Sequence, residues 1–564
     1  MFIRLSTLQR SSLLFPSILF KKFESKQPLA PVHRALAALV LIAFSGVSLA
    51  QAPAGLPNRL NAPSGSSGAL PSLGDGLELS AAAERRIGDR IAASIYRDPD
   101  YVDDPVLVDY VQSIWQPLLA AARARGELAA ELDERFAWTI FLIRDRSINA
   151  FALPGGYFGV HLGLIGAVGS ADEMAAVLAH EMSHVTQRHI SRLMTQQSRQ
   201  APWMIAAMVL GALAASKHPD AGTAAMVGGQ ALAVQGQLNF SRDMEREADR
   251  IGFGVMSDAG FASRGVSSMF ERLQQASRLN DNGAFPYLRS HPLTTQRIAE
   301  AQARVQLASA PADALFAPKQ ADVGRALLLH AMMAARARIL AVPGVDALRA
   351  TLAEARRRSD GLLPLSSPAS AANIRDAGAL YGGALAAAQL RDFATARSLL
   401  AHLKPLAAGQ AQAGKAFELL GIEIELLDGK VAPSAASVDL GKVTSRAELL
   451  TEARSLTAAN RAPEVSQALR VWVADHPKDA LAWQLLAVAY NQQNQSVRAI
   501  RAEAESRAAQ LDYTGALDRM KAAQLLMRRQ PGSADYVEGS ILDTRTRQVE
   551  LLVREQAIQD RVDH

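Results

Sequence analysis

Two histidines four residues apart are the feature of this sequence with the most direct chemistry. His180 and His184 flank Glu181 in the segment His-Glu-Met-Ser-His, which is an H-E-x-x-H pattern. Positions i and i+4 of a helix lie one turn apart on one face, so both imidazoles can reach one metal ion. Glu181, beside the first imidazole, can take a proton from water bound to that metal. The pattern therefore predicts hydrolysis at a zinc ion, with Glu181 as the general base.

The residues around the motif favour this chemistry over a structural role for the two histidines. Apolar side chains surround it, with Met174, Val177 and Leu178 before it and Val185 after it. Two imidazoles and a carboxylate in such a helix would cost desolvation free energy without a purpose. His189 follows five residues after the motif, and we expect it at the protein surface.

A catalytic zinc ion usually has three protein ligands and one open position, so a third ligand must come from elsewhere. The segment Glu245-Arg-Glu247-Ala-Asp249 supplies carboxylates on a predicted helix. Glu245 and Asp249 are one turn apart, so one can bind zinc while the other holds a ligand imidazole in its correct tautomer. These residues alone leave open whether Glu245 or Glu247 is the ligand.

Five segments of the chain together resemble the motifs of peptidase family M48, and especially its periplasmic branch with C-terminal tetratricopeptide repeats. The resemblance covers about residues 80–300 and continues more loosely to the end of the chain. It implies a mainly α protein, in which a zincin-like α+β metallopeptidase domain with a small sheet is followed by an α-helical tetratricopeptide-repeat domain. The segments are Arg97–Tyr101, Ile148–Gly156, His180–His189, Glu245–Gly252 and Ser290–Pro292.

The resemblance also implies which acids serve the metal. Glu245 corresponds to the family's third zinc ligand, which would complete a site with His180 and His184 that holds one zinc ion per chain. Asp249 corresponds to the acid that supports a ligand imidazole.

His291 and Arg297 match two further residues near the metal in this family. In its prenyl-protein proteases they are thought to steady the tetrahedral intermediate. In its periplasmic branch, the matching histidine can instead occupy the open position of the metal and keep the enzyme latent. A surface histidine with neither role is the remaining alternative.

The elements that must position these residues are predicted from hydrophobic periodicity and from turn and cap residues. Ser80 can cap the first helix, a small sheet with a glycine turn at Gly155-Gly156 spans 137–165, and the H-E-x-x-H motif lies on a long helix over 171–194. Beyond about residue 320, paired helices resemble tetratricopeptide repeats. The remaining predictions are helices over 106–122 and 241–258, and inter-helix turns within 381–400 and 512–517, with a repeat-like helix around Trp483.

Two segments are candidates for contact with other molecules. In the resembling family, the segment 150–156 forms the edge of the active-site cleft, where an exposed strand can pair with an extended substrate. The apolar block Trp203–Ala215 is too short to span a bilayer, so we expect a buried or interfacial helical hairpin there. This block could cover the cleft, contact a membrane peripherally or contact an unfolded client, and ordinary core packing is the alternative.

The net charge of +5 resides in residues 1–34, where six basic side chains face a single acid. An uncharged run then ends in Ser48-Leu-Ala50, which predicts a secretory signal peptide over 1–50 cleaved after Ala50. An uncleaved anchor is the alternative. A flexible leader over 51–76, a peptidase domain over 77–315 and a repeat domain over 316–564 follow. With the charge so placed, nothing indicates nucleic-acid binding, and the absence of cysteine excludes disulfides.

These inferences lead to two alternative functions. The first is a periplasmic zinc endopeptidase for misassembled envelope and outer-membrane proteins, whose repeats recruit clients or the outer-membrane assembly machinery. The second is a periplasmic assembly chaperone or scaffold with a largely latent metal site. An intact Glu181 favours the enzyme, because a scaffold has no need of a base.

Overall fold

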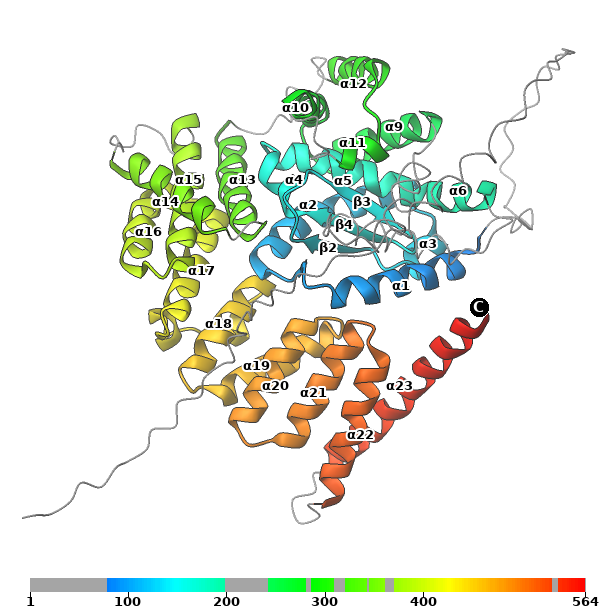
Figure 1. The fold of residues 1–564 in the computed structure, drawn as a ribbon, viewed down its shortest axis with the longest axis vertical. Coiled ribbons are helices and arrows are strands. Elements are labelled where there is room, and N and C mark those ends of the chain that lie inside the picture. Colours follow the sequence, from blue (N-terminus) through cyan, green and yellow to red (C-terminus); the bar gives the residue numbers. More distant parts are fainter. Residues whose placement is uncertain are drawn as a thin grey trace, which may run out of the picture. The chain divides into compact units, whose positions relative to one another are not determined.

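The computed structural model describes residues 79–197, 242–279, 286–308, 320–341, 344–360, 370–529 and 536–562. The predicted signal peptide, the leader and the apolar block 203–215 lie outside these residues. Within them the chain is mainly helical with one four-stranded sheet, as the sequence predicts (Figure 1). None of the described helices is long and apolar enough to cross a lipid bilayer.

The first helices begin at side-chain caps. Helix α1 (Ala81–Arg97) begins after Ser80, whose hydroxyl accepts a hydrogen bond from the backbone N–H of Ala83, as the sequence predicts. Helix α2 (Pro105–Ala124) begins after Asp104, whose carboxylate accepts from the N–H of Leu107. The short helix α3 (Ala130–Arg135) leads into the sheet.

The sheet has the strand order β1-β2-β4-β3. β2 and β4 pair in parallel, and β1 and β3 pair antiparallel to their neighbours. Gly155 and Gly156, with φ of 74° and 78°, form the turn between β3 and β4, which confirms the predicted glycine turn. The strands are β1 (Tyr101–Val102), which the sequence did not predict, β2 (Thr139–Ile143), β3 (Ala150–Leu153) and β4 (Tyr157–His161).

One helix prediction was wrong in its extent. The motif helix α5 (Ala171–Thr186) ends eight residues before the predicted end at residue 194, and α6 (His189–Gln197) follows as a separate helix. Between them, Arg188 adopts a left-handed φ of 53°. The other helices of this part are α4 (Leu162–Ala167), α9 (Arg242–Asp258), α10 (Arg264–Leu279), α11 (Pro286–Ser290) and α12 (Thr295–Ala308).

The rest of the described chain consists of helices joined by short turns. Arg391, Asn460, Asn494 and Leu511 each adopt a φ near 60° in such a turn, and the turns predicted within 381–400 and near residue 512 are confirmed. The helices are α13 (Gln320–Ala341), α14 (Val345–Asp360), α15 (Ala371–Gln389), α16 (Phe393–Ala407), α17 (Ala411–Leu427), α18 (Arg446–Ala458), α19 (Ala462–Asp475), α20 (Ala480–Gln492), α21 (Ser496–Ala509), α22 (Tyr513–Arg529) and α23 (Tyr536–Val562), with 3₁₀ turns at Pro433–Ala436 and Leu440–Lys442.

The apolar core is continuous across the predicted domain boundary. One cluster of buried side chains extends from α2 and α5 through α13 and α15 to α17, with Trp115 and Tyr381 among its largest members. A second cluster holds α18–α21 together. The division at residues 315 and 316 therefore stays a prediction.

Candidate metal centre

Helix α5 carries the motif, and α9 lies directly against it. Gly252 on α9 allows this approach, because a Cβ atom there would be 3.1 Å from the backbone of Ala179 and His180. Ser170 caps the start of α5 by accepting from the N–H of Glu173. The close contact places Glu245, near the start of α9, beside the imidazoles of α5.

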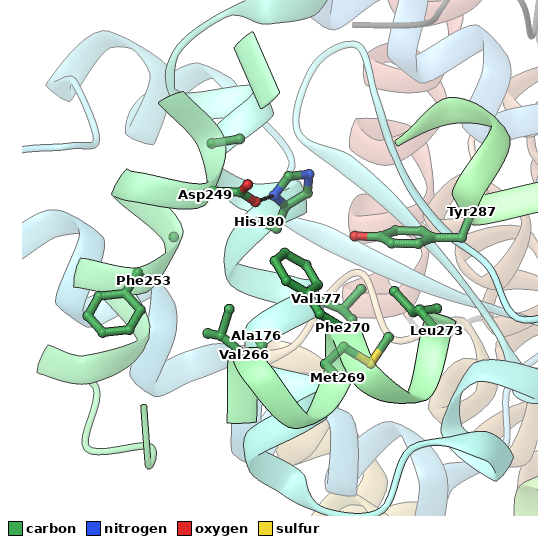
Figure 2. Close-up of a pocket in the computed structure, with 12 residues that line it drawn as sticks. Ala176, Val177, His180, Asp249, Phe253, Val266, Met269, Phe270, Leu273 and Tyr287 are labelled. Atoms are coloured by element: carbon green, nitrogen blue, oxygen red, sulfur yellow. Dashed lines mark ion pairs between the residues drawn. The ribbon is translucent and has the colours of Figure 1, made fainter. Parts of the chain in front are cut away.

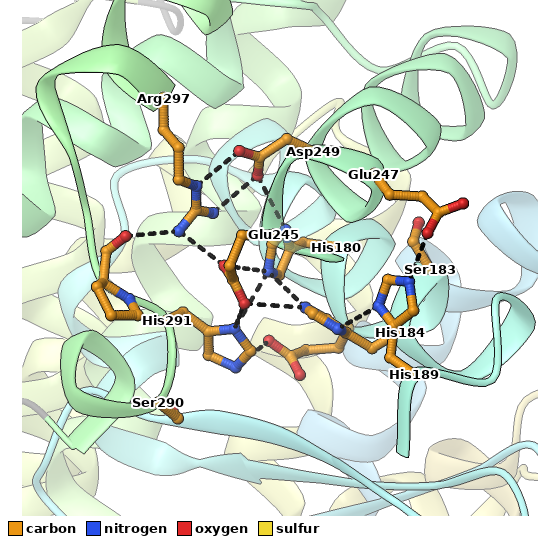
Figure 3. Close-up of polar contacts among 12 residues, drawn as sticks. His180, Ser183, His184, His189, Glu245, Glu247, Asp249, Ser290, His291 and Arg297 are labelled. Atoms are coloured by element: carbon orange, nitrogen blue, oxygen red, sulfur yellow. Dashed lines mark hydrogen bonds and ion pairs between the residues drawn. The ribbon is translucent and has the colours of Figure 1, made fainter. Parts of the chain in front are cut away.

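Four side chains converge in a buried cluster (Figure 3). One ligand-type atom from each of His180, His184, Glu245 and His291 lies within 4.8 Å of all the others. The Nε2 atoms of His180 and His184 are 3.0 Å apart, and each is 3.5 Å from a carboxylate oxygen of Glu245. His291 Nδ1 is 3.3 Å from His180 Nε2 and 3.0 Å from Glu245 Oε1.

These separations fit a metal ion of zinc's size. Tetrahedral ligands at zinc's bond lengths lie about 3.3 Å from one another. Three imidazole nitrogens and one carboxylate oxygen are also donors that zinc prefers. The sequence-predicted ligands His180, His184 and Glu245 are thus brought together, and His291 is the fourth donor of the cluster.

Glu181 lies beside the cluster and makes few polar contacts. Its side chain is 1% exposed, and neither carboxylate oxygen makes a hydrogen bond to a side chain of the described residues. Burial raises the pKa of Glu181, while the nearby His291 and His180 oppose that shift. A buried carboxylate with a raised pKa beside a metal cluster suits a group that accepts a proton from water.

An acid and an arginine support His180 on its outer side. His180 Nδ1 lies 3.0 Å from Asp249 Oδ1, so an N–H at Nδ1 donated to the carboxylate leaves the Nε2 lone pair for a metal. The guanidinium of Arg297 binds both oxygens of Asp249, at 2.7 and 2.8 Å, and lies 2.7 Å from Glu245 Oε2. Burial acts to raise the pKa of Asp249, but Arg297 and His180 lower it to about 2.

His189 is not at the surface, which corrects the sequence prediction. Its side chain is fully buried, with Nδ1 only 2.8 Å from His184 Nδ1. Its Nε2 lies 3.0 Å from Glu247 Oε2, which also accepts a hydrogen bond from Arg192 at 2.8 Å. Glu247 therefore lies outside the metal cluster, whereas Glu245 lies within it. No local pattern predicts this arrangement, because the turn before His189 contains neither glycine nor proline.

A short helix and a turn hold His291 in the cluster. Its backbone N–H donates to the carbonyl of Tyr287 on α11, and its ring lies 4.8 Å from the Tyr287 ring, centroid to centroid. Arg297 also donates to the carbonyl of Pro292, which ties this turn to the arginine beside Asp249. His291 Nε2 is 3.4 Å from Glu181 Oε1, so the imidazole lies between the cluster and the candidate base.

A small cavity borders His180 and Asp249 (Figure 2). Its volume of about 30 Å³ leaves room for little more than one water molecule. Apolar side chains of α5, α9 and α10 line most of it, among them Val177, Met269 and Phe270. The cavity is too small for a substrate side chain, so it belongs to the packing behind the cluster.

Comparisons with known proteins agree with this geometry. Residues 109–305 match the model of a family described as Peptidase family M48. The chain is 37% identical over 239 residues to the putative beta-barrel assembly-enhancing protease of Vibrio cholerae, which covers 42% of this chain and 47% of that protein. The beta-barrel assembly-enhancing protease of Yersinia pestis is 29% identical over 450 residues, covering 78% of this chain and 83% of that protein.

A third relative is the beta-barrel assembly-enhancing protease of Escherichia coli (strain K12), which is 33% identical over 237 residues. The match to the Escherichia coli protein covers 42% of this chain and 47% of the relative. The chain therefore spans about half the length of the Vibrio cholerae and Escherichia coli relatives. The matched segments include the residues of the metal cluster. Residues 109–305, which hold this cluster, are thus similar to peptidase family M48.

Proposed function

We propose that this protein is a periplasmic zinc endopeptidase that cleaves misassembled envelope and outer-membrane proteins. The observation that carries the proposal is the buried carboxylate of Glu181, which lies next to a cluster of three imidazoles and one carboxylate and makes no hydrogen bond to a described side chain. A zinc ion in that cluster would lower the pKa of a bound water and polarise a substrate carbonyl. His180, His184 and Glu245 would hold the ion.

The side chains around the ion would have separate tasks. Glu181 would accept the proton of the attacking water and later deliver it to the leaving amine. Asp249 and Arg297 would keep His180 in the tautomer that binds metal, and Arg297 would also hold Glu245 ionised through their contact of 2.7 Å.

The substrate class is supported by features around the cluster. β3 is one of the two edge strands of the sheet and lies next to α5, so an extended peptide can add to it through backbone hydrogen bonds. The similarity to relatives named beta-barrel assembly-enhancing proteases supports the proposal that the substrates come from outer-membrane assembly. The predicted signal peptide supports export to the periplasm, and the helical hairpins after α13 are candidates for recruiting clients or the assembly machinery.

The proposal is tested by zinc content and client cleavage in Glu181→Gln. We expect this variant to fold and keep zinc, because Glu181 is not a ligand, and to lose peptide hydrolysis by on the order of 100- to 10,000-fold, because the amide cannot accept the proton. Glu173→Gln is a matched control, since Glu173 is a buried glutamate on the same helix that pairs with Arg272. Unchanged turnover in Glu181→Gln would remove Glu181 from the mechanism.

A second function is favoured by one feature of the cluster. With His291 as a fourth donor, the position that a catalytic zinc needs for water would be filled. An assembly scaffold with a latent metal site is therefore the alternative. It predicts that wild-type and Glu181→Gln proteins support envelope assembly equally in cells.

A further inference from the structure

His184 and His189 form a direct imidazole-to-imidazole contact on the side of His184 away from the metal cluster (Figure 3). His184 directs Nε2 into the cluster, where it lies 3.0 Å from His180 Nε2. Its Nδ1 lies 2.8 Å from Nδ1 of His189. A neutral imidazole that binds metal through Nε2 carries its only proton on Nδ1. His184 must therefore donate this proton to His189.

The direction of that first hydrogen bond fixes the next two. If His189 Nδ1 accepts a proton, the proton of its own neutral ring is on Nε2. That N–H points to Glu247 Oε2 at 3.0 Å, and the same oxygen accepts from Arg192 at 2.8 Å. The series from His184 through His189 to Glu247 and Arg192 is then satisfied with each donor facing an acceptor.

The break between α5 and α6 is what makes this contact available. In a continuous helix, a residue five positions after His184 would lie about 140° around the axis from it. The left-handed backbone of Arg188 instead ends α5 and turns the chain back. The Arg188 side chain is held by the carbonyl of Leu79 and by the buried carboxylate of Glu84, which supports this conformation.

We propose that His189 is a positioning residue for the metal, which fixes the tautomer and the ring orientation of His184, and that Glu247 and Arg192 in turn fix His189. The proposal rests on the proposed zinc site. His180 has a different support, because a carboxylate clamped by Arg297 faces its Nδ1 directly. The two ligand imidazoles of the motif are thus oriented by two separate hydrogen-bonded series.

The test is the zinc affinity of four variants of the full mature chain, measured by competition with a chelator. We expect His189→Leu, which removes the acceptor, to weaken zinc binding by about 10- to 100-fold. His189→Asn should recover most of that loss, because its amide oxygen lies close to where Nδ1 of the imidazole was. Glu247→Gln keeps an acceptor for His189 but not its charge, so its loss should be smaller than that of His189→Leu.

His330→Leu is the matched control for losing a buried histidine. His330 is 2% exposed and forms hydrogen bonds with Tyr110 and with the carbonyl of Val168. Neither partner belongs to the metal cluster. We expect this variant to lower the melting temperature of the zinc-free protein while its zinc affinity stays that of the wild type.

Three outcomes would overturn the proposal. The first is a His189→Leu protein that folds and binds zinc like the wild type. The second is His189→Asn binding zinc as weakly as His189→Leu, since the acceptor would then not matter. The third outcome concerns the case in which His189→Leu does not fold. In that case, a Glu247→Gln protein that binds zinc as tightly as the wild type would overturn the proposal. A wild-type protein that binds no zinc would instead refute the proposed function, whereas normal zinc binding and cleavage in His189→Leu would refute this inference alone.

Discussion

Glu181 and Glu245 are two buried glutamates in one site whose surroundings act in opposite directions. Burial raises the pKa of Glu181, and the nearby His291 and His180 and a backbone hydrogen bond from Ala152 offset that shift only in part. Burial also acts to raise the pKa of Glu245, but His291 and His180 lower it far below its ordinary value. Opposite shifts of this kind separate a proton acceptor from a permanently charged ligand. The same residue type therefore suits two tasks in this site.

His291 is the residue whose role one substitution can decide. If it fills the fourth position of a zinc ion, it excludes the attacking water, and His291→Ala should raise cleavage of a loosely folded protein such as casein. If it stabilises the oxyanion, the same change should lower turnover by on the order of 100-fold. Its position in the cluster, 3.0 Å from Glu245 and 3.4 Å from Glu181, favours the first role.

The measurement is casein cleavage at equal zinc occupancy of wild type and variant. Because a lost ligand can also lower zinc affinity, zinc must be present well above its dissociation constant for both proteins. Reduced turnover at full occupancy would refute a latch role for His291, and unchanged turnover would make it a bystander.

At the scale of elements, sequence patterns predicted what is local and missed what depends on packing. The Ser80 cap and the Gly155-Gly156 turn were predictable, because each depends on its own side chain or backbone freedom. The two-residue strand β1 was missed, because only its pairing with β2 defines it. The end of α5 was also missed, since the apolar pattern continues past Arg188, whose conformation depends on contacts with residues more than 100 positions away.

The residues of the metal site also differ in how far the sequence could predict them. The spacing within α5 was enough to pair His180 with His184, because helical geometry alone sets that relation. The choice of Glu245 over Glu247 needed the resemblance to a known family, since both lie near the start of one helix. His189 could not be found from the sequence, because its burial depends on the break in the helix.

Gly252 on α9 offers a test of how closely the two metal-binding helices must pack. Replacing a helical glycine by alanine normally stabilises a helix by about 1 kcal/mol. At Gly252, a Cβ would be 3.1 Å from the backbone of Ala179 and His180, so α9 must shift away from α5. We expect Gly252→Ala to lower both the melting temperature and the zinc affinity, because the shift displaces Glu245.

Gly254→Ala is the matched control on the same helix. Its Cβ would meet only the end of the Arg125 side chain among the nearest atoms, and that flexible guanidinium can move. This variant should be as stable as the wild type or more so, with unchanged zinc affinity. Equal behaviour of the two variants would show that α5 and α9 tolerate a wider separation.

At the scale of the whole molecule, buried ion pairs join the peptidase part to the helices that follow it. Arg336 on α13 is 3% exposed and binds Asp104, at the start of α2, through two nitrogens at 2.6 and 2.8 Å. It also binds Glu423 on α17 at 2.7 Å. Removing one partner of a buried ion pair leaves a buried charge without compensation, which lowers the free energy of unfolding by about 3–5 kcal/mol.

This linkage should appear in the pH dependence of stability. Burial acts to raise the pKa of Asp104, but Arg336 lowers it below its ordinary value. A carboxyl group whose pKa is lower in the folded state stabilises the fold above its unfolded pKa, and this contribution is lost as the pH falls through the folded value. Asp104→Asn should therefore be less stable than the wild type at neutral pH, and the difference should shrink below about pH 4.

Chemical denaturation of the two proteins between about pH 7 and pH 3 measures that difference, and subtracting them removes the contribution of the other acids. The asparagine can still cap α2, because its side-chain oxygen accepts from the N–H of Leu107 as the carboxylate does. The ion pair with Arg336 is therefore the main interaction that the substitution removes. Glu354→Gln, at an exposed pair with Arg357 on α14, is the control and should change stability little at any pH, because solvent screens that pair. A stability difference for Asp104→Asn that does not vary with pH would mean that the substitution acts through packing, and that the charge of Asp104 does not stabilise this junction.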